Sequence, residues 1–110
     1  MYIDDEEPLC RIFQHLLRLE QFAVHTFVDP EEALAFVNAN DVAVVVCDYK
    51  MPNLTGVDLL DRIDDDVPFY LITGDLQVKE RARTWRRVTG VLSKPVDAHV
   101  LLEVVARHAR

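Results

Sequence analysis

The chain has 110 residues, of which 50% are hydrophobic, and it carries a net charge of −7. This length suits one domain with its own hydrophobic core, and the acidic balance argues against a protein that binds nucleic acid directly through its phosphates. No apolar stretch approaches the length of a membrane span, and the acidic pair Asp4-Asp5 comes almost at once, so we expect a cytoplasmic protein with no signal peptide and no membrane partner.

The first half of the chain predicts alternating helices and strands. Apolar residues over 8–20 recur with the spacing of an amphipathic helix, and 23–27 then predicts a strand. The next helix begins after Asp29 as N-cap, with Pro30 at its first position. Residues 42–47 are apolar without alternation, which indicates a strand buried on both faces, as in the centre of a parallel sheet.

The second half continues this alternation. The elements predicted there are a loop over 49–55, a helix over 56–63, a strand over 69–72, a helix over 76–87, a strand over 91–92 and a last helix capped by Asp97. Regular alternation of this kind predicts an α/β fold with a parallel sheet covered by helices on both sides. We expect a single domain over 1–110, with no further domain after the last helix.

Polar residues follow four of the predicted strands. They are Asp4 with Asp5, then Asp48, Thr73 and Lys94. Because the carboxyl ends of parallel strands lie along one edge of a sheet, we expect these side chains to converge. A cluster of acids with one hydroxyl and one ammonium suits the handling of Mg²⁺ and a phosphoryl group.

Each polar residue of this cluster can be given a chemical role. Each like-charge pair at about 4 Å costs on the order of 4 kcal/mol at an effective dielectric near 20, so a cation must offset the acids. Mg²⁺ is one such cation and Lys94 is another, aimed by the turn at Pro95. Asp48 is a candidate nucleophile toward phosphorus, and Thr73 can donate to a phosphoryl oxygen. Taken singly, each motif also fits a simple cap or turn, but together they are much harder to attribute to chance.

As a set, these motifs resemble the receiver domain of two-component response regulators over essentially the whole chain. The residues that carry the resemblance are 3–8 with Arg11, 47–52 with Gly56, Thr73-Gly74 and Ser93-Lys94-Pro95. The resemblance implies a flavodoxin-like three-layer sandwich, with a five-stranded parallel sheet of order 2-1-3-4-5 and five helices.

The resemblance also implies what the acids do. Asp48 would accept a phosphoryl group from a sensor histidine kinase or a phosphotransfer protein. Asp5, Asp48 and the backbone carbonyl of Lys50 would hold Mg²⁺ or Mn²⁺, and Asp4 would assist through water. By this resemblance the protein is not an enzyme beyond self-catalysed phosphotransfer and dephosphorylation.

Thr73 and Lys94 would carry the switch signal to the surface around the fourth helix, fifth strand and fifth helix, with Val91 and Pro95 in the same region. The family usually has Tyr or Phe where Val91 stands, and Val has no ring to rotate. Lys50 and Asp75 stand at positions that, in this family, flank the approach of the attacking water. We expect them to pair across the pocket mouth and to slow loss of the phosphoryl group.

A basic segment within the predicted fourth helix suggests a docking face on an acidic body. Its residues include Lys79, Arg83, Arg86 and Arg87. A solvated surface is the alternative, but the resemblance favours a partner face, possible also for a homodimer, between the fourth and fifth helices. Trp85 lies on the inward stripe of the predicted helix, so we expect it to pack in the core.

Two other functions remain open. A Mg²⁺-dependent aspartyl phosphatase would want a second acid two residues after the nucleophile, and that position is Lys50. A phosphorylation-independent interaction module with the same fold is favoured mildly by Val91 and opposed by the complete set of acids.

Overall fold

The structure of the chain is a computed structural model that describes residues 1–109. Its elements, in order, are β1 (Tyr2–Ile3), α1 (Glu7–Leu19), β2 (Thr26–Phe27), α2 (Pro30–Ala39), β3 (Val45–Asp48), β4 (Lys50–Met51), β5 (Leu54–Thr55), α3 (Gly56–Asp61), β6 (Phe69–Thr73), α4 (Leu76–Ala82), β7 (Gly90–Ser93) and α5 (Ala98–His108).

Within residues 1–109, five strands form one sheet in the order β2-β1-β3-β6-β7, and every neighbouring pair is parallel. The short strands β4 and β5 form a separate antiparallel hairpin. When only the parallel strands are counted, the order is the predicted 2-1-3-4-5. The predicted α/β fold with a flavodoxin-like sheet is therefore confirmed.

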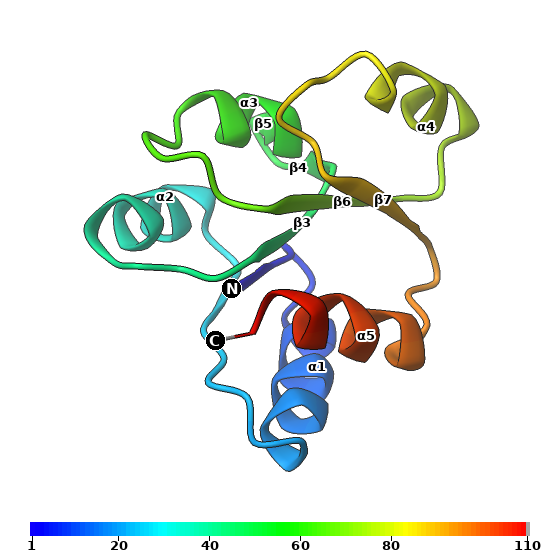
Figure 1. Cartoon of the computed structure of the whole chain (residues 1–110). Coiled ribbons are helices and arrows are strands. Elements are labelled where there is room, and N and C mark those ends of the chain that lie inside the picture. Colours follow the sequence, from blue (N-terminus) through cyan, green and yellow to red (C-terminus); the bar gives the residue numbers. More distant parts are fainter. Residues whose placement is uncertain (110) are drawn as a thin grey trace.

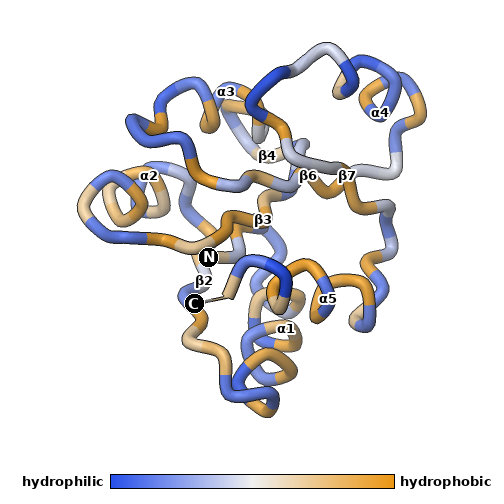
Figure 2. The backbone as a smooth tube through the Cα atoms, viewed as in Figure 1, coloured by the Kyte–Doolittle hydropathy of each residue, from blue (hydrophilic) through white to orange (hydrophobic). Residues whose placement is uncertain are grey.

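The helices cover both faces of this sheet (Figure 1). One core cluster joins α1 and α5 to the sheet, and the other joins α2 and α3 to its opposite face. Helix α4 lies on the side of α2 and α3, beside β7 (Figure 1). In Figure 2, orange runs along β3, and orange alternates with blue along α5, as expected for a buried strand and for a helix that packs on one side. Among residues 1–109, no helix has the length and apolar character needed to cross a membrane.

Two predicted helix starts are confirmed by their caps. Asp29 accepts a hydrogen bond from the N–H of Glu31, and Asp97 accepts one from the N–H of His99. At α3, the predicted start at Gly56 is correct, and Thr55 caps it by accepting a hydrogen bond from the Asp58 N–H. Side-chain oxygens thus satisfy amide groups that the first turn of a helix cannot.

The helix predicted over 76–87 is wrong in its second half, because α4 ends at Ala82. Four-residue turns follow, in which the N–H of Trp85 donates to the Ala82 carbonyl and the N–H of Val88 donates to the Trp85 carbonyl. The guanidinium of Arg87 donates to three carbonyls at the end of α3, of Leu60, Ile63 and Asp65. These long-range bonds draw the segment 83–89 toward α3 and away from the axis of α4.

Candidate functional site

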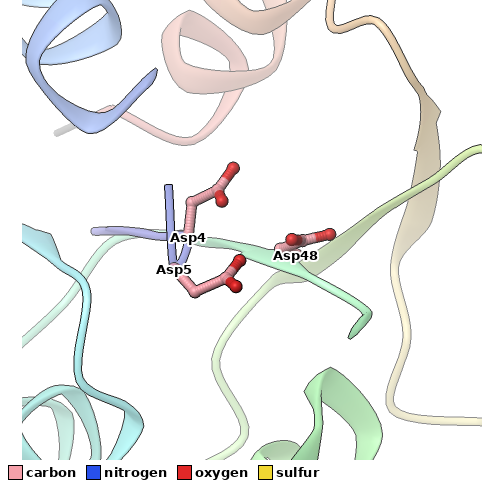
Figure 3. A group of neighbouring side chains, drawn as sticks. All are labelled: Asp4, Asp5 and Asp48. Carbon is pink, nitrogen blue, oxygen red and sulfur yellow. The ribbon is translucent and has the colours of Figure 1, made fainter. Parts of the chain in front are cut away.

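Three carboxylates meet at the carboxyl ends of β1 and β3. One ligand atom each from Asp4, Asp5 and Asp48 lies within 4.8 Å of the others, so the group could hold a metal ion. Figure 3 shows Asp4 and Asp5 at the end of β1, beside Asp48 on β3. Asp4 and Asp48 are buried, with 0% and 2% of their surface exposed, whereas Asp5 is exposed. The expected convergence of these acids is therefore seen.

Asp4 is held in place by its own neighbours. Its carboxylate accepts hydrogen bonds from the Glu6 N–H at 2.9 Å and from the Tyr2 hydroxyl at 3.1 Å. Burial raises the pKa of Asp4, and the nearby charge of Asp48 raises it further, against the opposing effect of the Glu6 hydrogen bond. Burial and the charge of Asp4 together raise the pKa of the Tyr2 phenol, so this hydroxyl remains a donor.

Lys94 supplies one positive charge to the cluster. Its Nζ lies 3.0 Å from Oδ1 of Asp48. Burial acts to lower the pKa of Lys94, but the hydrogen bond and the charge of Asp48 outweigh it and raise that pKa. The pKa of Asp48 is also raised, because burial and the charge of Asp5 exceed the effect of Lys94. One ammonium therefore leaves the three acids incompletely neutralised, which favours a further cation.

Thr73 stands on the other side of the cluster, at the buried end of β6. Its Oγ1 accepts a hydrogen bond from the Asp75 N–H at 3.1 Å, and its backbone carbonyl accepts one from the Lys94 N–H at 3.2 Å. The peptide bond between Lys94 and Pro95 is cis. Because Oγ1 serves Asp75 as an acceptor, its own proton remains for a ligand, and the same hydroxyl touches the start of α4.

Asp75 and Lys50 do not form the expected pair, since no ion pair between them is found among residues 1–109. Asp75 instead caps α4 and accepts hydrogen bonds from the N–H groups of Gln77 and Val78. Lys50 is exposed on β4. Their effect on the loss of a phosphoryl group stays a prediction.

The four residues of the basic segment have different surroundings in the structure. Arg83 and Arg86 are exposed, and Lys79 donates a hydrogen bond to the Ser93 hydroxyl at 2.8 Å, between α4 and β7. Arg87 is different, because its guanidinium is committed to the end of α3. The docking role of all four residues stays a prediction, and for Arg87 it would have to accommodate these bonds within the domain.

Sequence reasoning missed two aromatic contacts. Trp85 is partly buried against the core as expected, but it lies beyond α4 and stacks on Tyr49, with ring centroids 6.2 Å apart and planes at 6°. The guanidinium of Arg81 lies over the same indole, 5.8 Å from its centroid. Val91 pairs with Leu71 in the register of β6 and β7. No local signal in the sequence announces the pair of Tyr49 and Trp85.

Comparisons with known proteins agree with this architecture. Transcriptional regulatory protein FixJ of Rhizobium meliloti is 30% identical over 109 residues, which are 96% of this chain and 53% of FixJ. Transcriptional regulatory protein PrrA of Mycobacterium tuberculosis is 33% identical over 110 residues, which are 97% of this chain and 46% of PrrA. The chain thus spans about half the length of these two relatives.

The solved receiver domain of the hybrid histidine kinase CckA superposes with a TM-score of 0.81 at 25% identity, over 99% of this chain and 96% of that one. The family model described as the response regulator receiver domain matches residues 1–106. With its parallel sheet and its acids at the strand ends, this chain belongs to the receiver domain family of two-component response regulators.

Proposed function

We propose that Asp48 accepts a phosphoryl group from a sensor histidine kinase or a phosphotransfer protein, and that this modification switches the protein. The observation that carries the proposal is the meeting of Asp48 with two further acids and Lys94 at the ends of the parallel strands. In the transfer, a carboxylate oxygen of Asp48 forms a bond to phosphorus while the bond from phosphorus to the donor nitrogen breaks. The domain works as a cytoplasmic receiver over 1–110.

The acid cluster fits a divalent cation, because hard oxygen ligands are close together and their negative charge exceeds that of Lys94. Asp5, Asp48 and the backbone carbonyl of Lys50 would hold Mg²⁺ or Mn²⁺, with Asp4 acting through water. When bound, the ion withdraws negative charge from the phosphoryl oxygens.

Lys94 and Thr73 are the side chains that read the modified site. Lys94, now 3.0 Å from Asp48, supplies its ammonium to the added oxygens, which bring about −1.5 to −2 charges. Thr73 turns its free proton toward the same oxygens. Because Thr73 also accepts the Asp75 N–H, the start of α4 follows this movement. The surface of α4, β7 and α5 is then the output face, for a partner or for a second copy of the chain.

The test is incubation with acetyl phosphate and Mg²⁺, followed by intact mass. We expect a single phosphate adduct on the wild-type chain, none on Asp48→Asn, and an unchanged adduct on the control Asp61→Asn, which alters an exposed acid at the end of α3. Release of many phosphates per chain would instead indicate an aspartyl phosphatase. Absence of any adduct would overturn the proposal and favour a phosphorylation-independent interaction module, the alternative that Val91 suggests.

A further inference from the structure

Tyr49 joins the acid site directly to the segment after α4. It follows Asp48 in the chain, and its backbone is fixed on both sides: its N–H donates to the Ile72 carbonyl at 2.9 Å, and its carbonyl accepts the Gly56 N–H at 2.7 Å. Its side chain is half-buried and stacks on Trp85. A change at Asp48 therefore has a short route to the indole.

A second route runs from the same site through α4. Thr73 holds the Asp75 N–H, and Asp75 caps α4, which has seven residues. At the end of this short helix, Arg81 lies over the ring of Trp85. The two routes leave the acid cluster from β3 and from β6, and they meet at one aromatic residue. Movement of α4 relative to the β3 end would therefore displace Arg81 from the indole and pull on Trp85 through the bond of its N–H to the Ala82 carbonyl.

We propose that the stacked pair of Tyr49 and Trp85, with Arg81 over the indole, is a latch that holds α4 in its resting position and opens when the acid site is filled. Tyr49 and Trp85 are positioning residues in this role, because they act through α4 and touch no reacting atom. The inference rests on the proposed phosphoryl acceptance at Asp48. It gives the domain an aromatic reporter although Val91, in β7, carries no ring.

The expected change in the phosphorylation rate follows from the strength of the aromatic stack. Aromatic pairs with centroids 4.5 to 7 Å apart stabilise a contact enough to bias an equilibrium roughly two- to tenfold. Removing the stack should therefore raise, by that factor, the population of the conformation in which the latch is open. This holds as long as the resting conformation, with the latch closed, dominates. A small phosphodonor that reacts with the open conformation will then modify the chain roughly two- to tenfold faster.

The experiment follows two readouts in the same samples, adduct formation by intact mass and emission of Trp85, the single tryptophan of the chain. We expect wild-type emission to change in step with the adduct in acetyl phosphate and Mg²⁺. Tyr49→Leu should start with shifted emission and gain the adduct roughly two- to tenfold faster. Tyr49→Phe, which keeps a ring, should restore wild-type behaviour. Phe36→Leu is the matched control, because it removes ring contacts with His25 and Phe27 far from α4.

The outcomes separate the latch from the acceptor function. An adduct on the wild-type chain without an emission change, or a wild-type rate in Tyr49→Leu with a folded circular dichroism spectrum, would overturn the latch and leave Asp48 as the acceptor. Equal acceleration in Phe36→Leu would also overturn it, since loss of any aromatic contact would then suffice. Absence of an adduct on the wild-type chain would refute the acceptor function itself, and the latch with it.

Discussion

Arg87 offers a direct measure of how the segment after α4 is anchored. Its guanidinium donates to the carbonyls of Leu60 at 2.9 Å, Ile63 at 3.0 Å and Asp65 at 2.9 Å. The bond to Asp65 is exposed, so water replaces it at little cost, whereas the other two are partly buried. At about 1 kcal/mol for each partly buried bond, Arg87→Met should lower the free energy of unfolding by about 2 kcal/mol. Methionine retains most of the apolar stem, so the change tests the guanidinium.

Arg86→Met is the matched control, because Arg86 is the exposed neighbour and surface changes of this kind stay within about 0.5 kcal/mol. Urea unfolding followed by far-ultraviolet circular dichroism gives the midpoint and the slope, and thermal unfolding should show Arg87→Met melting roughly 8 °C lower. If Arg87→Met and Arg86→Met unfold within about 0.5 kcal/mol of each other, the guanidinium does not anchor the segment and the explanation for the early end of α4 fails.

Three further changes test the surroundings of the acid site. Gly56→Ala should cost about 1 to 3 kcal/mol in urea unfolding, because a Cβ there would lie 2.9 Å from the backbone carbonyl oxygen of Asp48; Gly74→Ala, with 3.6 Å to its nearest neighbour, should cost far less. Burial raises the pKa of Cys10 to about 11, so its thiol should react with a disulfide reagent at pH 8 only at the rate of unfolding, and fast reaction of the folded chain would contradict this. Burial raises the pKa of Asp4 above 3.8, so its contribution to stability is present below that pH and is lost as the pH rises. Without metal, Asp4→Asn should therefore melt at a higher temperature than the wild-type chain at pH 7 and lose this advantage in acid. An equal difference in melting temperature at both pH values would refute the reasoning.

The site could be predicted because its residues are tied to strand ends. An apolar run such as that before Asp48 must be buried, and the residue that ends it then lies at the sheet edge whatever the details of the loops. The same holds for Thr73 at the end of β6. Caps at Asp29 and Asp97 were equally predictable, because their hydrogen bonds join residues only two positions apart.

Features that depend on distant partners were not predictable. The early end of α4 reflects bonds from Arg87 to carbonyls 22 to 27 positions earlier in the chain. The contact of Tyr49 with Trp85 also joins separate segments, and neither residue has a local signal for it. Strand limits depend on the neighbouring strand as well: residues 23–25 lie outside β2, because its neighbour β1 has only two residues. The local sequence pattern predicts whether a segment is a helix or a strand, whereas the residues at which it begins and ends depend on its tertiary contacts.

The placement of Arg87 has a consequence for engineering the domain. Helix α4 is fastened at its start by the Asp75 cap, and the turns behind it are held by the bonds of Arg87 to α3 and by the stack of Trp85 on Tyr49. The exposed residues of α4, among them Leu76, Gln77 and Glu80, make no contribution to either fastening through their side chains within the described residues. Leu76, Gln77 and Glu80 can therefore be substituted to change what the outer surface binds, while Arg81 stays over Trp85 and Val78 and Ala82 keep the inner surface packed against the sheet.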